Sequence, residues 1–88
     1  MEMLRRRLGS VVARTVDRDL LLLDTESELI HQLNETASFI WNRCDGGNSA
    51  AEIAQLLADE FAVESNVALN DVVETLKKLR EVNLVVDA

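Results

Sequence analysis

Signals that start and stop helices divide the chain from residue 34 onward, and they constrain the fold more than any other feature. Asn34 is suited to cap a helix, because its side chain can accept a hydrogen bond from an N–H group of the first turn. Gly46-Gly47 predicts the end of that helix, since the residue beyond a helix often needs a positive φ. Ser49 with Glu52 forms a capping box that opens a second helix.

A third helix is bounded by Ser65, which can cap its start, and by Asn83, which tolerates the left-handed conformation at a helix end. In all three segments the apolar residues recur at helical spacing. They are Ala37, Ile40, Trp41 and Cys44; then Ile53, Leu56, Leu57 and Phe61; then Leu69, Val72, Val73, Leu76 and Leu79. The apolar residues 84–86 are expected to pack back on the core or to form a short final strand.

Three short apolar or β-branched runs precede the helices. They cover residues 11–16, 20–23 and 29–33, and polar stretches typical of turns separate them. The runs predict a meander of three antiparallel strands whose last strand, 29–33, lies at an edge. A three-stranded antiparallel sheet followed by three helices is an α+β domain.

Charge is distributed unevenly along a chain whose net charge is −7. Residues 1–18 carry +3, largely through Arg5, Arg6 and Arg7, and the remainder carries −10. An acidic body repels the phosphate backbone, so no nucleic-acid partner is expected. We assign residues 1–9 to a basic N-terminal arm that is solvated or touches an acidic partner, and residues 10–88 to a single domain.

Cysteine usage and hydropathy indicate a cytoplasmic protein without a membrane partner. A single cysteine excludes an internal disulfide framework and fits a reducing compartment. The apolar run Leu20-Leu21-Leu22-Leu23 is far too short to span a bilayer. The three N-terminal arginines are not followed by an apolar stretch of the length found in secretory signals.

Side chains suited to catalysis or metal binding are few. His31 is the only histidine, and no CxxC, HxxxH or HExxH spacing occurs. Cys44 falls on the apolar side of the first predicted helix, where a buried structural thiol is expected. We therefore expect no enzymatic activity, no metal site and no cofactor.

A set of short motifs spans most of the chain. They are Leu33-Asn34-Glu35-Thr36-Ala37, Phe39-Ile40-Trp41, Cys44-Asp45-Gly46-Gly47, Glu52-Ile53, Asp71-Val72 and Asn83-Leu84-Val85. In this combination they resemble the PqqD-like family over roughly residues 10–86. The resemblance implies a winged-helix-like domain that acts as a non-catalytic peptide chaperone. Its implied partners are the leader of a ribosomally made precursor peptide and a separately encoded modifying enzyme, either a radical SAM enzyme or a leader peptidase.

The resemblance does not identify the biosynthetic pathway. Pyrroloquinoline quinone synthesis, lasso peptide synthesis and another peptide pathway all stay possible. It also implies where the leader binds: it pairs with the third strand and lies against the third helix. An edge strand has unpaired N–H and C=O groups that can accept another strand. The expected peptide-binding residues are Leu29, Ile30, His31, Gln32 and Leu33 in the strand, and Val72, Thr75, Lys78 and Leu79 in the helix.

Other interpretations stay open. Core packing is the alternative for Leu29, Leu33, Val72 and Leu79. A winged-helix domain can place its third helix in the major groove, so a DNA-binding transcription regulator is the alternative function. The third helix, however, lacks the exposed Arg, Asn and Gln side chains that read base edges. A homodimer through the edge strand would use the same hydrogen bonds as a bound peptide.

Overall fold

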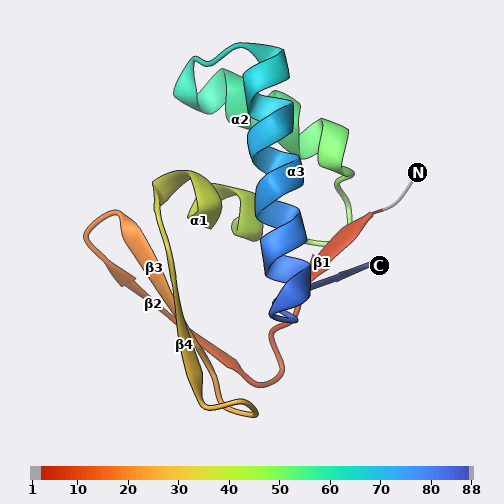
Figure 1. The fold of residues 1–88 in the computed structure, drawn as a ribbon. Coiled ribbons are helices and arrows are strands. Elements are labelled where there is room, and N and C mark those ends of the chain that lie inside the picture. Colours follow the sequence, from red (N-terminus) through yellow and green to blue (C-terminus); the bar gives the residue numbers. More distant parts are fainter. Residues whose placement is uncertain (1–2, 88) are drawn as a thin grey trace.

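The computed structural model describes residues 3–87. An antiparallel sheet with the strand order β2-β3-β4 comprises β2 (Val11–Val16), β3 (Asp19–Asp24) and β4 (Leu29–Leu33). Three helices follow: α1 (Glu35–Asn42), α2 (Ala50–Phe61) and α3 (Ser65–Glu81) (Figure 1). Two short strands, β1 (Leu4–Arg6) and β5 (Val85–Asp87), form a second antiparallel sheet. The predicted winged-helix-like α+β class is confirmed.

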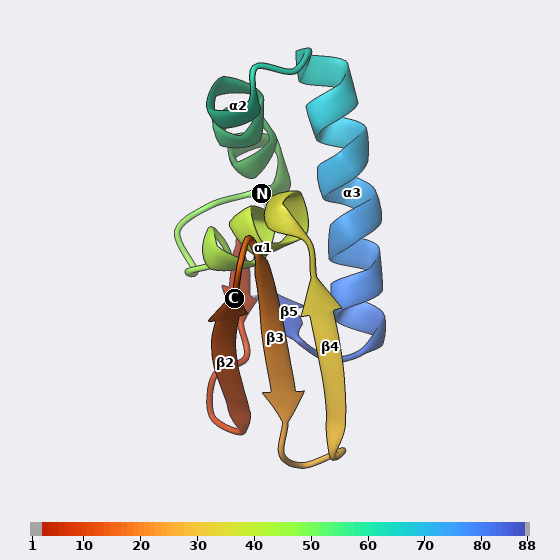
Figure 2. The ribbon, with the colours of Figure 1, turned by 90° about the vertical axis from the view of Figure 1, so that its left-hand side faces the viewer.

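The helices form a layer at one end of the sheet, with α1 directly on the strands and α2 beyond it (Figures 1 and 2). The long helix α3 extends out of this layer and runs down beside β4 (Figure 2). Between sheet and helices lies one core, which includes Leu20, Leu22, Leu33, Ile40, Trp41, Ile53, Leu57, Leu76 and Leu79. Strand β3 contributes to this core with alternate side chains: Leu20 and Leu22 face the core, while Leu21 and Leu23 face outward.

The caps of α1 and α2 follow the predictions at their starts. The Asn34 side chain accepts a hydrogen bond from Ala37 N at 2.9 Å. Ser49 and Glu52 form the predicted capping box, with Ser49 N donating to Glu52 Oε1 at 3.0 Å and Glu52 N donating to Ser49 Oγ at 3.3 Å. Each pair satisfies N–H groups that the first helical turn leaves without partners.

Two predicted helix boundaries are wrong. Helix α1 ends at Asn42 with Arg43 as its C-cap in a right-handed conformation, so Gly46-Gly47 lies beyond the helix and does not stop it. Gly46 has φ +88°, and a Cβ there would lie 2.9 Å from the Nη2 of Arg5. Ser65 is the first residue of α3 and not its cap, because Glu64 holds that position and makes no side-chain capping bond.

The end of α3 is the Schellman arrangement that Asn83 was predicted to allow. Asn83 has φ 61°, and its N–H donates to Arg80 O at 3.0 Å. Leu84 N donates to Leu79 O at 2.8 Å, which reverses the chain and buries Leu84. The indole Nε1 of Trp41 donates to Leu84 O at 3.1 Å and ties α1 to the same corner.

The prediction of a solvated N-terminal arm is wrong for residues 4–6. Leu4 is 1% exposed and lies opposite Asp87 in the β1–β5 ladder. Gly46 N donates to Leu4 O at 2.8 Å, and Arg6 N donates to Cys44 O at 2.6 Å. The strand is held by backbone bonds on both sides, so it packs as part of the domain despite its basic composition.

Candidate functional site

The free edge of β4 is the starting point for the site, because within residues 3–87 its one neighbour in the sheet is β3. The turn between β2 and β3 shows which residue pairs of the sheet are hydrogen-bonded, and therefore which backbone groups of β4 are unpaired. Asp17 and Arg18 join Val16 to Asp19, which lie opposite each other in the ladder. In such a two-residue hairpin the flanking residues form a hydrogen-bonded pair.

Hydrogen-bonded pairs recur at every second residue of an antiparallel ladder. The odd-numbered residues of β3 therefore bond to β2, and the even-numbered residues bond to β4. Leu22 lies opposite His31, so Leu29, His31 and Leu33 return the bonds of β3. The N–H and C=O groups of Ile30 and Gln32 consequently point away from the sheet, toward the free edge.

Two hollows lie along this edge between β4 and α3, and together we call them the β4–α3 groove. The upper hollow, at the end of β4 that leads into α1, has a volume of about 390 Å³. It is lined by Gln32, Leu33, Asn34, Thr36, Ala37, Asp71, Glu74, Thr75, Lys78 and Leu79. The lower hollow has a volume of about 430 Å³. It is lined by Arg7, Asp24, Glu26, Ser27, Leu29, His31, Glu81, Val82 and Asn83.

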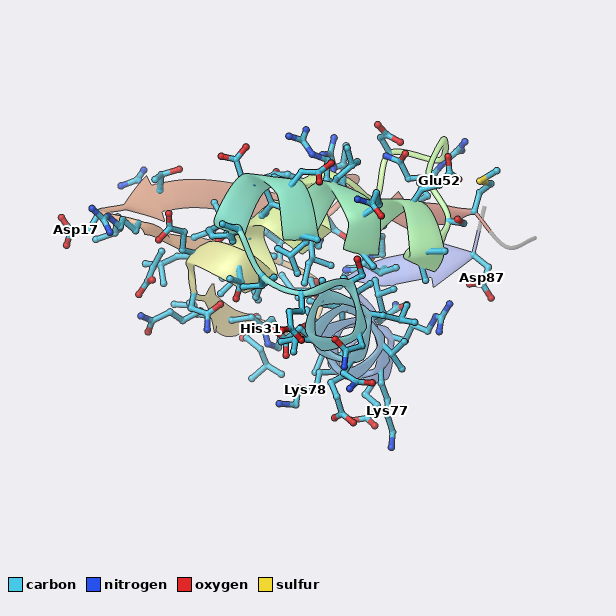
Figure 3. All side chains as sticks on the ribbon, turned by 90° about the horizontal axis from the view of Figure 1, so that it is seen from above. Asp17, His31, Glu52, Lys77, Lys78 and Asp87 are labelled. Carbon is cyan, nitrogen blue, oxygen red and sulfur yellow. The ribbon has the colours of Figure 1, made fainter. Side chains whose placement is uncertain are left out.

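Seven of the nine expected peptide-binding residues line this groove. Five line the upper hollow: Gln32, Leu33, Thr75, Lys78 and Leu79. Leu29 and His31 line the lower one. Figure 3 shows Lys78 extending from α3 on the side where His31 lies, whereas Lys77 extends in another direction.

The structure does not place Ile30 and Val72 in the groove. Val72 is 0% exposed and belongs to the core, so its side chain has no surface to offer a ligand. The Ile30 side chain is 68% exposed on the outer face of the sheet, in a shallow hollow with Val12 and Leu23. Its backbone nevertheless lies on the free edge, beside the groove.

Several groove residues were not among the peptide-binding residues expected from the sequence. Asp71 and Glu74 lie four residues before Thr75 and Lys78, so helical spacing alone would have placed them on the same flank. Arg7 and Glu26 had no comparable signal, because tertiary packing of distant segments brings them into the lower hollow.

An ion pair forms the wall of the lower hollow. Arg7 Nη2 lies 2.7 Å from Asp24 Oδ1 and 3.8 Å from Glu26 Oε2. Desolvation by burial raises the pKa of Asp24, but the backbone N–H of Glu26, the charge of Arg7 and hydrogen bonds from Ser27 outweigh it. The pKa of Asp24 therefore lies below its ordinary value, and the carboxylate stays ionised at neutral pH.

Reactive groups are sparse in the described part of the chain. Within residues 3–87 no three His, Cys, Asp or Glu side chains are placed to hold a metal ion together. None of the helices in this range has the length and hydropathy needed to cross a membrane. Cys44 is fully buried, and its Sγ donates to Ile40 O at 3.2 Å.

We expect Cys44 to resist thiol reagents in the folded protein. Desolvation by burial raises the pKa of its thiol to about 11, so almost no thiolate is present at pH 8. Labelling by a disulfide reagent should be at least about 100-fold slower in the folded protein than in denaturant, because the thiolate is the reacting species. The rate of absorbance change measures this, and stoichiometric labelling of the folded protein within the mixing time would contradict it.

Comparison with known proteins gives three matches. The family model described as "Coenzyme PQQ synthesis protein D (PqqD)" matches residues 19–85. The solved structure of lasso peptide synthetase B1 complexed with the leader peptide has a TM-score of 0.80 at 32% identity, covering 94% of this chain and 96% of that one. TbiB1 in complex with the TbiA(beta) leader peptide has a TM-score of 0.79 at 22% identity, covering 92% and 93%. The second likeness concerns the fold alone. No curated protein matches the chain.

Proposed function

Since the chain belongs to the PqqD family, we propose that it binds the leader of a ribosomally made precursor peptide and presents it to a separately encoded modifying enzyme. The observation that carries the proposal is the free edge of β4 beside the β4–α3 groove. An added strand gains main-chain hydrogen bonds from such an edge, and its alternate side chains reach the neighbouring groove. The related synthetase B1, which is complexed with a leader peptide, supports the same use.

The backbone of Ile30 and Gln32 provides the hydrogen bonds in this proposal. Each residue offers one N–H donor and one C=O acceptor toward the edge, and a bound strand would extend the sheet from three strands to four. Side chains on one face of that strand would enter the groove and meet Leu33 and Leu79. A homodimer through the same edge would occupy the same groups, so it would compete with the peptide.

The chemical step belongs to the modifying enzyme in this proposal. That partner is a radical SAM enzyme or a leader peptidase, and the chain itself acts as a non-catalytic chaperone in the cytoplasm. The charges on the groove-lining flank of α3 favour peptide over DNA. Asp71, Glu74 and Glu81 line the groove against one lysine, Lys78, and such a flank repels a phosphate backbone.

Calorimetric titration with a precursor peptide tests the proposal, and a short reading frame beside the gene, if one is found, is the candidate to use. We expect saturable one-to-one binding to the full precursor and to its isolated leader, because the edge strand pairs with main-chain groups of the leader. The precursor without its leader is the matched control and should release no heat of binding. Absence of binding to the full precursor at high micromolar concentration would contradict the proposal.

A further inference from the structure

The rims of the β4–α3 groove are acidic while its floor is apolar. From this we infer that the groove selects peptide segments that carry Lys or Arg beside the apolar residues on the floor. The inference rests on the proposed function and adds the chemical class of the segment that is recognised. The net charge of each of the two hollows supports this inference.

In the upper hollow the floor and the rim differ in character. Leu33 and Leu79 are 8% and 3% exposed, so they present only small apolar surfaces at the bottom. Asp71 and Glu74 are exposed on the flank of α3, and Lys78 one turn further is the cation among the lining residues. The lining of this hollow therefore has a net negative charge.

The lower hollow also has a net negative charge, because three carboxylates and one arginine line it. The charge of Arg7 is neutralised by Asp24 at 2.7 Å, and its second contact, to Glu26, is longer at 3.8 Å. Glu26 and Glu81 therefore leave a negative charge on opposite walls, one from the β3–β4 turn and one from α3. The hollow also lies at the C-terminus of α3, where the helix dipole adds negative potential.

The preference applies to one face of a bound strand. Its groove-facing side chains meet the four carboxylates Glu26, Asp71, Glu74 and Glu81. Its other face continues the outer face of the sheet, where the nearest hollow contains Val12, Leu21, Leu23 and Ile30 with one cation, Arg14. Cationic residues are therefore favoured at alternate positions of the peptide, and not throughout it.

Selection from a random library tests the inference without a known precursor. A phage-displayed library of 12-residue peptides is panned on the immobilised protein, and the most enriched peptide is synthesised. We expect Lys and Arg to be enriched at alternate positions. Changing those residues to Glu in the synthetic peptide should weaken binding about tenfold or more, because each exposed charge pair contributes a factor of about 1.5 to 5.

A pair of charge-reversal variants assigns the effect to the groove. Glu74→Lys with Glu81→Lys should weaken binding of the selected peptide about tenfold by the same reasoning. Asp59→Lys with Glu60→Lys on α2 makes the same change in net charge outside the groove, and should alter binding less than about twofold.

The possible results separate the two proposals. Enriched peptides that bind the groove but are neutral or acidic on both faces would overturn the charge preference and leave peptide binding standing. An equal effect of the two double variants would overturn it as well, since the whole-molecule charge would then be responsible. If no peptide is enriched above the uncoated support, peptide capture itself fails, and the preference fails with it.

Discussion

We expect the Ile30→Pro variant to lose all measurable precursor binding and still to unfold cooperatively near the transition of the parent. The N–H of Ile30 points to the free edge, so proline removes no bond from the β3–β4 ladder. It does remove a donor that an added strand needs, and its ring occupies the space where that strand would approach. Calorimetry measures the binding, and urea unfolding measures the stability.

Two neighbouring variants serve as controls. The N–H of His31 points to β3, so His31→Pro should lower the free energy of unfolding by about 1–3 kcal/mol, because the Leu22 carbonyl loses its donor. Ile30→Ala keeps the backbone donor and removes only a side chain on the outer face, so it should bind nearly as the parent does. If folded Ile30→Pro and His31→Pro variants both bind like the parent, strand addition at β4 is wrong.

We expect Leu4→Ala to lower the free energy of unfolding by about 2–5 kcal/mol. Leu4 is 1% exposed in a segment that looks like a charged tail, and truncation would leave a cavity where β1 meets the core. The matched control is Leu8→Ala, four residues further on, where the side chain is 55% exposed. That change should stay within about 0.5 kcal/mol. Urea unfolding distinguishes them, and equal small effects would show that β1 does not contribute to the core.

The elements that could be predicted are those with local signals. Asn34, the Ser49–Glu52 pair and the apolar spacing within each helix all act over three or four residues, so they can be read along the chain. Strand β1 has only three residues, and it is a strand because it pairs with Val85–Asp87 at the other end of the chain. No local signal could predict that pairing. The end of α1 was missed for a similar reason, because its C-cap Arg43 is not glycine and lies three residues before Gly46.

The site could be predicted at the level of elements but not of all side chains. A meander places its last strand at an edge, which identified residues 29–33 without further information. Helical spacing does not separate a residue facing the core, such as Val72, from one facing the adjoining groove, such as Thr75. To predict which way the backbone groups of β4 point, one needs the register of a different hairpin, the one closed by Val16 and Asp19. That register is known only from the structure.

The pairing of β1 with β5 also sets how the domain can be joined to another protein. The two strands lie side by side on the far side of α3 from β4 (Figure 1). An enzyme fused through a given linker would therefore start from the same corner of the domain at either end. Its effective concentration at a peptide bound on β4 would then depend on the length and stiffness of the linker, and hardly on the choice of terminus.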